Sequence, residues 1–285
     1  MQSLNYIQYL KDNLQFIKKK KDLNNKELES KRQDRCGSVS LVGAGPGDPE
    51  LLTRKAWRLI NECDVLVYDA LVSEELLEGL PRSIERYYVG KRVGQHSMKQ
   101  IEICTLMVRL ALQGKTVCRL KGGDPLVFGR LGEELDALEN ENIPYEVVPG
   151  ITAASGCAAS LGISLTERGF ATRLRLITAT FSKPTEINWS ELASTDDTLV
   201  FYMGVGKASI ISSQLRAAGL PDNYPTLIVE NGTHKEQRAF GIKLIDLDET
   251  IKAEKIKAPA LIYVGKVIER YRKNTQIHPL LTMAS

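Results

Sequence analysis

The sequence predicts an α/β fold made of two units. Short apolar runs that are typical of buried strands alternate with longer helical patterns from residue 38 to residue 264. Glycine-rich turns follow two of these strands and lead into helices, an order typical of α/β folds. Pro149-Gly150 interrupts the pattern before a second alternating series begins. We therefore expect two α/β domains that meet near residue 150.

The first unit begins with an apolar run, Ser38 to Gly43, and most of its strands are separated by helical patterns. Parallel strands need such crossover connections, so we expect a largely parallel sheet. The predicted strands cover residues 38–43, 64–68, 85–89, 116–120 and 144–148, and the predicted helices cover 51–60, 98–113 and 130–140.

The second unit opens with a helix of small residues, 151–160. Strands are then predicted at 173–178, 198–203, 226–230, 237–242 and 259–264, and helices at 207–217 and 246–253. The chain is accordingly divided into a charged N-terminal extension (1–36), an N-terminal α/β domain (37–150), a C-terminal α/β domain (151–272) and a tail (273–285). The extension holds a run of four lysines, and we expect a solvated segment there, with a hook for a partner or for nucleic acid as the alternative.

Composition narrows the class of protein. The net charge is +3, and the chain has no basic stripe interleaved with aromatic residues, so we expect no nucleic-acid partner. No stretch approaches the roughly 20 apolar residues that span a bilayer, so we expect no membrane partner. Five cysteines without C-x-x-C spacing favour free thiols in the cytoplasm. The three histidines are scattered, so no metal site is expected.

Two glycine-rich turns carry the functional signal. The first, Gly43 to Pro49, is similar to the turn that binds dinucleotides, which makes a nicotinamide-dependent oxidoreductase the alternative from another class. Asp48 stands where the third glycine of that fingerprint belongs, and Pro46 removes a backbone amide, so phosphate binding is disfavoured. The second, Lys121 to Arg130, has two adjacent glycines that let a ligand approach the backbone, although an ordinary tight turn has the same composition.

Together these motifs resemble the tetrapyrrole methylase family, and within it the uroporphyrinogen-III C-methyltransferases, including the methylase half of fused sirohaem synthases. The resemblance covers roughly residues 35–270. It rests on Val42 to Thr53, Tyr68 to Ser73, Val89 to Arg92, Lys121 to Arg130, Val148 to Gly156, Gly162 to Thr166, Tyr202 to Gly204, and Glu230 to Arg238.

The resemblance implies two α/β domains with the active site in the cleft between them, and a homodimer. It implies methyl transfer from S-adenosyl-L-methionine, with S-adenosyl-L-homocysteine as product, to two pyrrole carbons of the tetrapyrrole uroporphyrinogen III. The product would be precorrin-2, from which sirohaem and cobalamin are made. A later precorrin methyltransferase of the same family is the nearer alternative.

The resemblance also assigns catalytic roles. Asp69 ends an apolar strand and matches the family's proposed proton acceptor, although a strand-end aspartate often only caps the next loop. Lys91 matches the proposed proton donor, and its alternative is an exposed loop lysine. The implied cofactor contacts are Pro46, Gly122, Gly123, Asp124, Val127, Thr152, Ala153, Met203 and Gly232.

Uroporphyrinogen III carries eight carboxylates, so its site needs cations. Arg92 and Arg130 are the first candidates, and Arg168 and Arg173 have weaker support. Each of the four has a structural salt bridge as its alternative. The chain departs from the family pattern at Leu131, at Glu167 and at Ala179-Thr180, which leaves fine substrate positioning open.

Overall fold

The structure is a computed structural model that describes residues 36–90, 98–180 and 187–271. The predicted tail and all but the last residue of the predicted N-terminal extension lie outside the described residues. So do Lys91 and Arg92, two of the predicted site residues.

The first sheet is entirely parallel, as the sequence predicts. Its order is β3-β2-β4-β1-β5, so β1 lies between the two strands that come latest in this unit. The strands are β1 (Ser38–Gly43), β2 (Val65–Tyr68), β3 (Glu85–Tyr88), β4 (Thr116–Lys121) and β5 (Tyr145–Val148). Because they are parallel, their carboxyl ends meet at one edge, where ligands bind in open α/β sheets.

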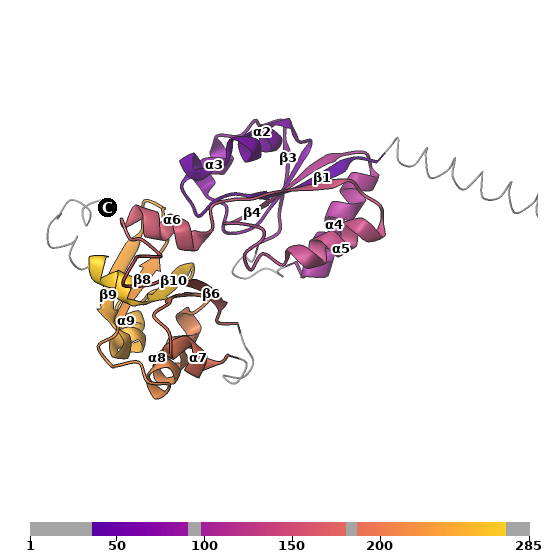
Figure 1. Ribbon diagram of the computed structural model, residues 1–285. Helices are drawn as coiled ribbons and strands as arrows, with labels where there is room; N and C mark the ends of the chain where they lie inside the picture. The colour runs from indigo at the N-terminus through magenta and orange to yellow at the C-terminus, as the bar shows by residue number, and fades with distance from the viewer. Residues whose placement is uncertain (1–35, 91–97, 181–186, 272–285) are drawn as a thin grey trace, which may run out of the picture.

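Two pairs of helices cover the two faces of this sheet (Figure 1). On one face α2 (Arg54–Glu62) and α3 (Glu74–Glu78) pack on β-strand residues such as Leu66 and Leu120. On the other face α4 (Gln100–Leu112) and α5 (Leu131–Asn140) pack on residues such as Val67 and Val117. Successive residues of a strand point to opposite faces, so each strand contributes to both cores.

The second sheet is mixed, with the order β6-β7-β10-β8-β9. Only β6 and β7 pair in parallel, and β10 runs antiparallel to both of its neighbours. β8 and β9 are consecutive in the chain and also pair antiparallel. The strands are β6 (Leu174–Thr178), β7 (Thr198–Tyr202), β8 (Pro225–Glu230), β9 (Arg238–Lys243) and β10 (Ala260–Val264).

One face of the second sheet packs on three helices, α7 (Trp189–Ala193), α8 (Ala208–Ala217) and α9 (Leu247–Ala253). The other face packs on α6 (Ala153–Ser160), whose Ala154, Cys157 and Ala158 join one core with strand residues such as Tyr263. Figure 1 shows α6 between the two sheets, so this short helix connects them. We propose that the boundary at residue 150 is correct, since the residues that follow it pack on the second sheet.

The sequence missed two short helices, α3 and α7. Each has only five residues, too few for a helical period to emerge. Their start signals were present, because Ser73 and Asn188 each cap the first turn through their side chains. The helix predicted at 51–60 begins instead at Arg54, because Pro49–Leu51 forms a separate 3₁₀ turn capped by Asp48.

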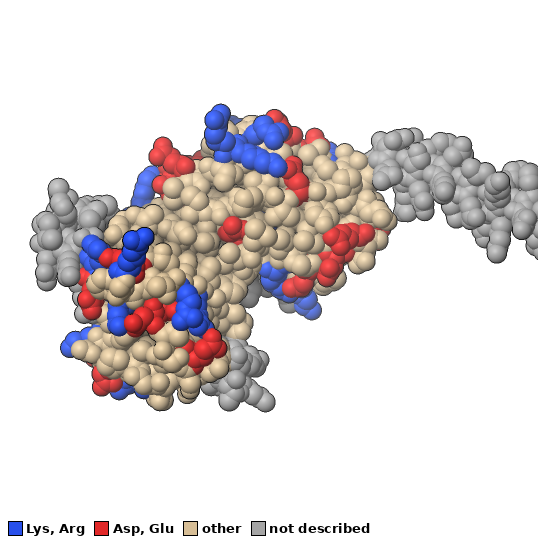
Figure 2. Space-filling view, viewed as in Figure 1, with Lys and Arg blue, Asp and Glu red and all other residues tan. Residues whose placement is uncertain are grey.

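Charged side chains of both signs lie in small mixed groups on the face shown in Figure 2, with wide neutral areas between them. This face therefore presents no continuous basic surface. Among the described residues, no helix combines the length and apolar character that a bilayer crossing requires. The expected absence of nucleic-acid and membrane partners stays a prediction.

Candidate functional site

The two glycine-rich turns contact each other directly at the carboxyl edge of the first sheet. Gly45 N donates to Gly123 O at 3.1 Å, and Gly123 N donates to Gly45 O at 2.6 Å. Gly43 packs so closely on Gly150 and Gly123 that a side chain there would overlap backbone atoms. The motifs at residues 43–49, 121–130 and 150–153 therefore form one compact group.

This group also contacts the second domain. Asp48 N donates to Thr233 Oγ1 at 3.1 Å, and Gly156 packs on the Pro46 ring. Lys235 forms an ion pair with Glu75 at 3.2 Å. The predicted site segments of both domains thus lie at their junction, which consists of loops 43–49, 121–130, 150–153, 202–204 and 230–235.

Asp69 follows β2 and makes two kinds of contact. Its Oδ1 accepts a hydrogen bond from Leu71 N at 3.0 Å, so the carboxylate does cap its own loop. Its Oδ2 also lies 3.5 Å from Nη2 of Arg119, on the neighbouring strand β4. The capping and the charged roles are therefore compatible, because one oxygen serves each.

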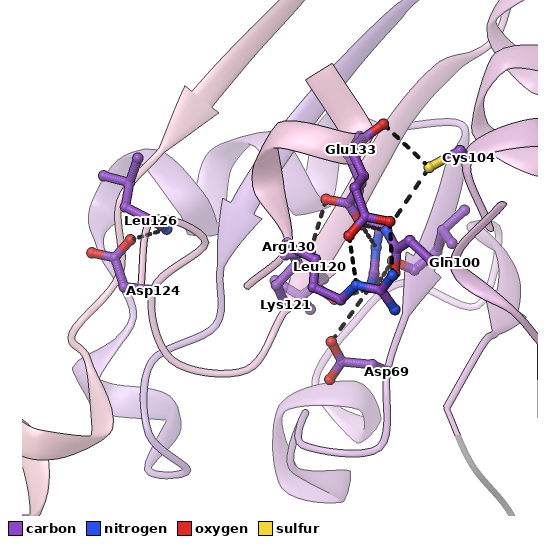
Figure 3. A network of polar contacts seen from close by, with 12 residues as sticks. Asp69, Gln100, Cys104, Leu120, Lys121, Asp124, Leu126, Arg130 and Glu133 are labelled. Atoms are coloured by element: carbon purple, nitrogen blue, oxygen red, sulfur yellow. Dashed lines mark hydrogen bonds and ion pairs between the residues drawn. The ribbon is translucent and has the colours of Figure 1, made fainter. Parts of the chain in front are cut away.

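Arg119 belongs to a buried network of charges under α5. The carboxylate of Glu134 is fully buried and accepts from Arg119 Nε at 3.1 Å, Lys121 Nζ at 2.8 Å and Gln100 Nε2 at 3.3 Å. Arg119 Nη1 donates to backbone carbonyls of Val67 and Leu120. In Figure 3 Asp69 points into this network at the end of β4, whereas Asp124 lies apart from it.

The charged side chains of this cluster are almost completely removed from water, which is unfavourable for each of them. Desolvation lowers the pKa of Lys121, the positive charge of Arg119 lowers it further, and Glu134 acts in the opposite direction. A buried carboxylate with two buried cations is poor evidence of a stability device, since apolar residues usually serve stability as well. We therefore infer that the network serves to hold Arg119 where its guanidinium pairs with the carboxylate of Asp69.

Sequence reasoning missed this network. Arg119 and Lys121 interrupt a central strand of a parallel sheet, whose residues are normally apolar on both faces. They share a face because they are two positions apart, and Glu134 meets them from the first turn of α5. Two cations in the middle of a predicted central strand were the available signal.

Arg130 lies in the same motif but points its guanidinium at Glu133. Nε and Nη2 each donate to a Glu133 oxygen at 2.7 Å, and the pair is largely exposed. These bonds lower the pKa of Glu133 below its ordinary value. Arg130 is therefore accessible to an anionic ligand, which would have to share the guanidinium with Glu133.

Thr152 marks the start of α6 without capping it through its own side chain. Its Oγ1 lies 2.6 Å from the hydroxyl of Tyr202, which also accepts from Ala154 N at 3.0 Å. The Tyr202 ring packs on Phe128, with centroids 5.0 Å apart. Tyr202 was not among the predicted site residues, because an aromatic at a strand end normally signals core.

Met203 directly follows Tyr202 at the end of β7 and leaves 54% of its surface exposed. Its sulfur accepts a hydrogen bond from Thr180 Oγ1 at 3.2 Å. Like Phe128 and Arg130, it has a left-handed backbone, with φ 57°. Such strain tends to collect at functional sites, and at the junction it also affects Asn231 and Thr233.

Two of the predicted cofactor glycines are required by protein packing. A side chain at Gly122 would overlap Leu71, and one at Gly232 would overlap the sulfur of Cys157. Gly123 differs, because its φ of 70° is the left-handed region that favours glycine. Among the described residues, no group of three or more His, Cys, Asp or Glu side chains is placed to hold a metal ion.

Comparison with known proteins agrees with this arrangement. Residues 38–248 match the family described as Tetrapyrrole (Corrin/Porphyrin) Methylases. The chain belongs to the tetrapyrrole methylase family. The match includes both glycine-rich turns, the buried network, α6 and Met203.

Relatives of this tetrapyrrole methylase include the siroheme synthase of Escherichia fergusonii, which is 48% identical over 242 residues. That alignment covers 85% of this chain and 52% of the relative. The siroheme synthase of Salmonella typhi is also 48% identical, with the same coverage. The chain therefore spans about half the length of the curated relatives it matches.

Solved structures give the same fold. The uroporphyrin-III C-methyl transferase of Thermus thermophilus, complexed with S-adenyl homocysteine, is 39% identical with a TM-score of 0.70. The alignment covers 82% of this chain and 94% of that one. A cobalt precorrin-4 methyltransferase is 26% identical with a TM-score of 0.73, covering 81% of this chain and 95% of that one.

The positions where this methylase departs from the family pattern have partners of their own. Glu167 accepts from Arg270 Nε at 2.9 and 2.8 Å, and Leu131 packs against the core under α4 and α5. Thr180 contacts Met203, as described above, so one departure lies within the predicted cofactor shell.

The two weaker arginine candidates differ in their surroundings. Arg173 pairs with the buried Asp197 at 2.8 Å, just before β6 and β7 begin. Because β6 and β7 are parallel, this pair lies at the end of the sheet opposite to Met203 and has the structural role that the sequence left open. Arg168 is exposed, on the segment that follows α6.

Proposed function

We propose that this chain transfers methyl groups from S-adenosyl-L-methionine to two pyrrole carbons of uroporphyrinogen III, giving precorrin-2 for sirohaem or cobalamin synthesis. The observation that carries the proposal is the 39% identity to a uroporphyrin-III C-methyl transferase along almost all of that enzyme. The cobalt precorrin-4 methyltransferase is more distant in sequence, at 26% identity, so a later precorrin methyltransferase is the second candidate. Family membership speaks against the nicotinamide-dependent alternative.

The described residues suit the methyl donor. Met203, Leu126 and Phe128 expose apolar or sulfur-containing surface, beside the polar groups of Asp124 and Thr152. Such a combination fits an adenosine with an amino-acid chain. We propose that Pro46, Gly122, Gly123, Asp124, Val127, Thr152, Ala153, Met203 and Gly232 hold it, in a cleft between the domains.

When bound, S-adenosylmethionine supplies a methyl group already activated by the positive charge of its sulfur. The protein then has to align the acceptor carbon and manage charge on the macrocycle. We propose that Asp69 stabilises the cationic pyrrole and accepts its proton, while Arg119 holds the carboxylate in place. Lys91 would act as proton donor, and Arg92 and Arg130 would bind substrate carboxylates.

The first test is the conversion of Asp69 to asparagine. The amide still accepts the bond from Leu71 N but carries no negative charge, so methyl transfer should fall by roughly 100- to 10,000-fold. The rate of methyl transfer should fall less in Lys91→Met, because a sulfonium leaving group needs no proton. Both are assayed anaerobically with uroporphyrinogen III, with mono- and dimethylated products followed by mass.

Asp64→Asn is the matched control. Asp64 also accepts a backbone hydrogen bond, from Thr116 N at 2.8 Å, but at the opposite end of β2. It should keep parental turnover. Equal turnover of Asp69→Asn and the parent would make Asp69 a loop cap only. Methylation of a later precorrin but not of uroporphyrinogen III would favour the second candidate.

Calorimetry with S-adenosylmethionine, S-adenosylhomocysteine and NAD in parallel tests the cofactor. Binding of NAD alone would overturn the proposal. The proposed cytoplasmic location is supported by the five cysteines, all of them free thiols. A homodimer is proposed on the family resemblance, and sedimentation of the purified chain tests it.

A further inference from the structure

The side chain of Tyr202 touches three of the segments that the proposed function gives to the methyl donor. Its hydroxyl contacts Thr152 at the start of α6, and its ring packs on Phe128 in the 121–130 loop. Its backbone leads directly into Met203. These segments come from both domains, and Tyr202 is the side chain that joins them at the junction.

The hydrogen bonds of this hydroxyl constrain where protons lie. Ala154 N–H donates to the Tyr202 oxygen at 3.0 Å, which leaves the single phenol hydrogen for another acceptor. Thr152 Oγ1, at 2.6 Å, is the neighbour that can accept it. If the phenol donates to Thr152 Oγ1, the hydroxyl hydrogen of Thr152 can be donated to an acceptor other than Tyr202.

Two further features favour this direction of donation. Thr152 does not spend its hydroxyl on capping α6, because Tyr202 already meets Ala154 N. A chain of hydrogen bonds that ends on an anion is also stronger than its separate members.

We propose that Tyr202 is a positioning residue for the carboxylate of the methyl donor: it donates to Thr152 Oγ1 and thereby aims the Thr152 hydroxyl at that carboxylate. This inference rests on the proposed function. Tyr202 itself touches no reacting atom, so its removal should weaken binding of the donor and leave the chemical step almost unchanged.

The test compares two ligands that differ only in the carboxylate, S-adenosylhomocysteine and decarboxylated S-adenosylhomocysteine, by calorimetry. Tyr202→Phe keeps the ring on Phe128 and removes the hydroxyl. This variant should bind S-adenosylhomocysteine about tenfold more weakly than the parent, as expected for the loss of one hydrogen bond to a charged group. The decarboxylated ligand should stay within about twofold of its parental affinity. In turnover, KM for S-adenosylmethionine should rise while kcat is retained.

Tyr263→Phe is the matched control. The Tyr263 hydroxyl donates to Ala154 O at 2.9 Å, so this variant also loses one hydrogen bond to α6, but it leaves Thr152 untouched. It should bind both ligands like the parent. If Tyr202→Phe and Tyr263→Phe weaken the binding of both ligands equally, Tyr202 only supports helix α6 and the proposal is wrong.

Variants of Thr152 test the second step of the proposed hydrogen-bond chain, from Thr152 to the ligand carboxylate. Thr152→Val should lose about as much affinity for S-adenosylhomocysteine as Tyr202→Phe, and the double variant should lose little more, because both act on one contact. Thr152→Ser keeps the hydroxyl and should retain affinity. Parental affinity in Thr152→Val would overturn the proposal even if Tyr202→Phe failed to fold. If the parent itself bound neither ligand, the proposed function would be wrong instead.

Discussion

Replacing Glu134 by glutamine should destabilise this protein far more than an ordinary substitution does. The carboxylate is fully buried and faces Arg119 and Lys121, both of which are almost completely buried as well. Glutamine has nearly the same shape but removes the negative charge that the two cations share, which leaves Asp69 as the acidic partner of Arg119. Breaking a buried ion pair in this way typically costs about 3–5 kcal/mol.

The structure supplies an upper bound for the lysine part of this cost. Lys121 can escape its unpaired state by losing a proton, and for a lysine of ordinary pKa at pH 7 that costs about 4.6 kcal/mol. Burial already lowers the pKa of Lys121, so the actual cost is smaller. Arg119 has no such escape, since a guanidinium stays protonated, but it keeps its bonds to two backbone carbonyls and its ion pair with Asp69.

Urea unfolding followed by circular dichroism measures the effect. Glu134→Gln should lower the free energy of unfolding by about 3–5 kcal/mol, and Glu134→Gln with Lys121→Met should recover part of that loss by removing one unpaired cation. Asp136→Asn, exposed on the same helix, should stay within about 0.5 kcal/mol of the parent. A loss below about 1 kcal/mol for Glu134→Gln, without recovery in the double variant, would show that the network is not electrostatically coupled.

The remaining predictions concern the same edge of the sheet. Gly122→Ala forces its new methyl group against Leu71, two residues from Asp69, so it should cost about 1–3 kcal/mol and reduce methyl transfer; Leu71→Gly in the same chain should restore part of both. Gly132→Ala, on α5 with open space around it, should instead stabilise by about 0.5–1 kcal/mol in urea unfolding. The pKa of Lys121 is lower in the folded than in the unfolded protein, so the folded state releases its proton first. Stability should therefore rise with pH between those two values, and the rise should vanish from titrated unfolding curves in Lys121→Met. Arg130→Leu should return the pKa of Glu133 toward its ordinary value in an NMR titration.

Much of the fold could be predicted because its elements follow simple patterns. Each of the ten strands in the described part of the chain lies at a predicted run, and the parallel direction of most strands in the first sheet follows from the helices predicted between them. The antiparallel place of β10 between β7 and β8 could not be predicted, because residues 259–264 are apolar in either direction. Pairing direction depends on contacts made by distant segments.

The site was predictable only in part. The glycine-rich turns were visible because their composition is local, and their direct contact through Gly45 and Gly123 agrees with a shared site. The roles of Glu134 and Tyr202 depend on which distant side chains they meet, on β4 for one and on α6 for the other. Both residues look ordinary in sequence, as a helix glutamate and a strand tyrosine.

The topology of the two sheets also has a consequence for folding. In the first sheet Ser38 pairs with Thr116 and Val39 with Tyr145. Strand β1 can therefore pair only after a long segment of chain has closed into a loop. In the second sheet β8 and β9 pair as neighbours, with Glu230 opposite Arg238. Because closing a short loop loses less entropy, we expect β8 and β9 to pair first during refolding, although they are synthesised after every strand of the first sheet. Pulsed hydrogen exchange would show their amides protected before those of β1, and the reverse order would refute this expectation.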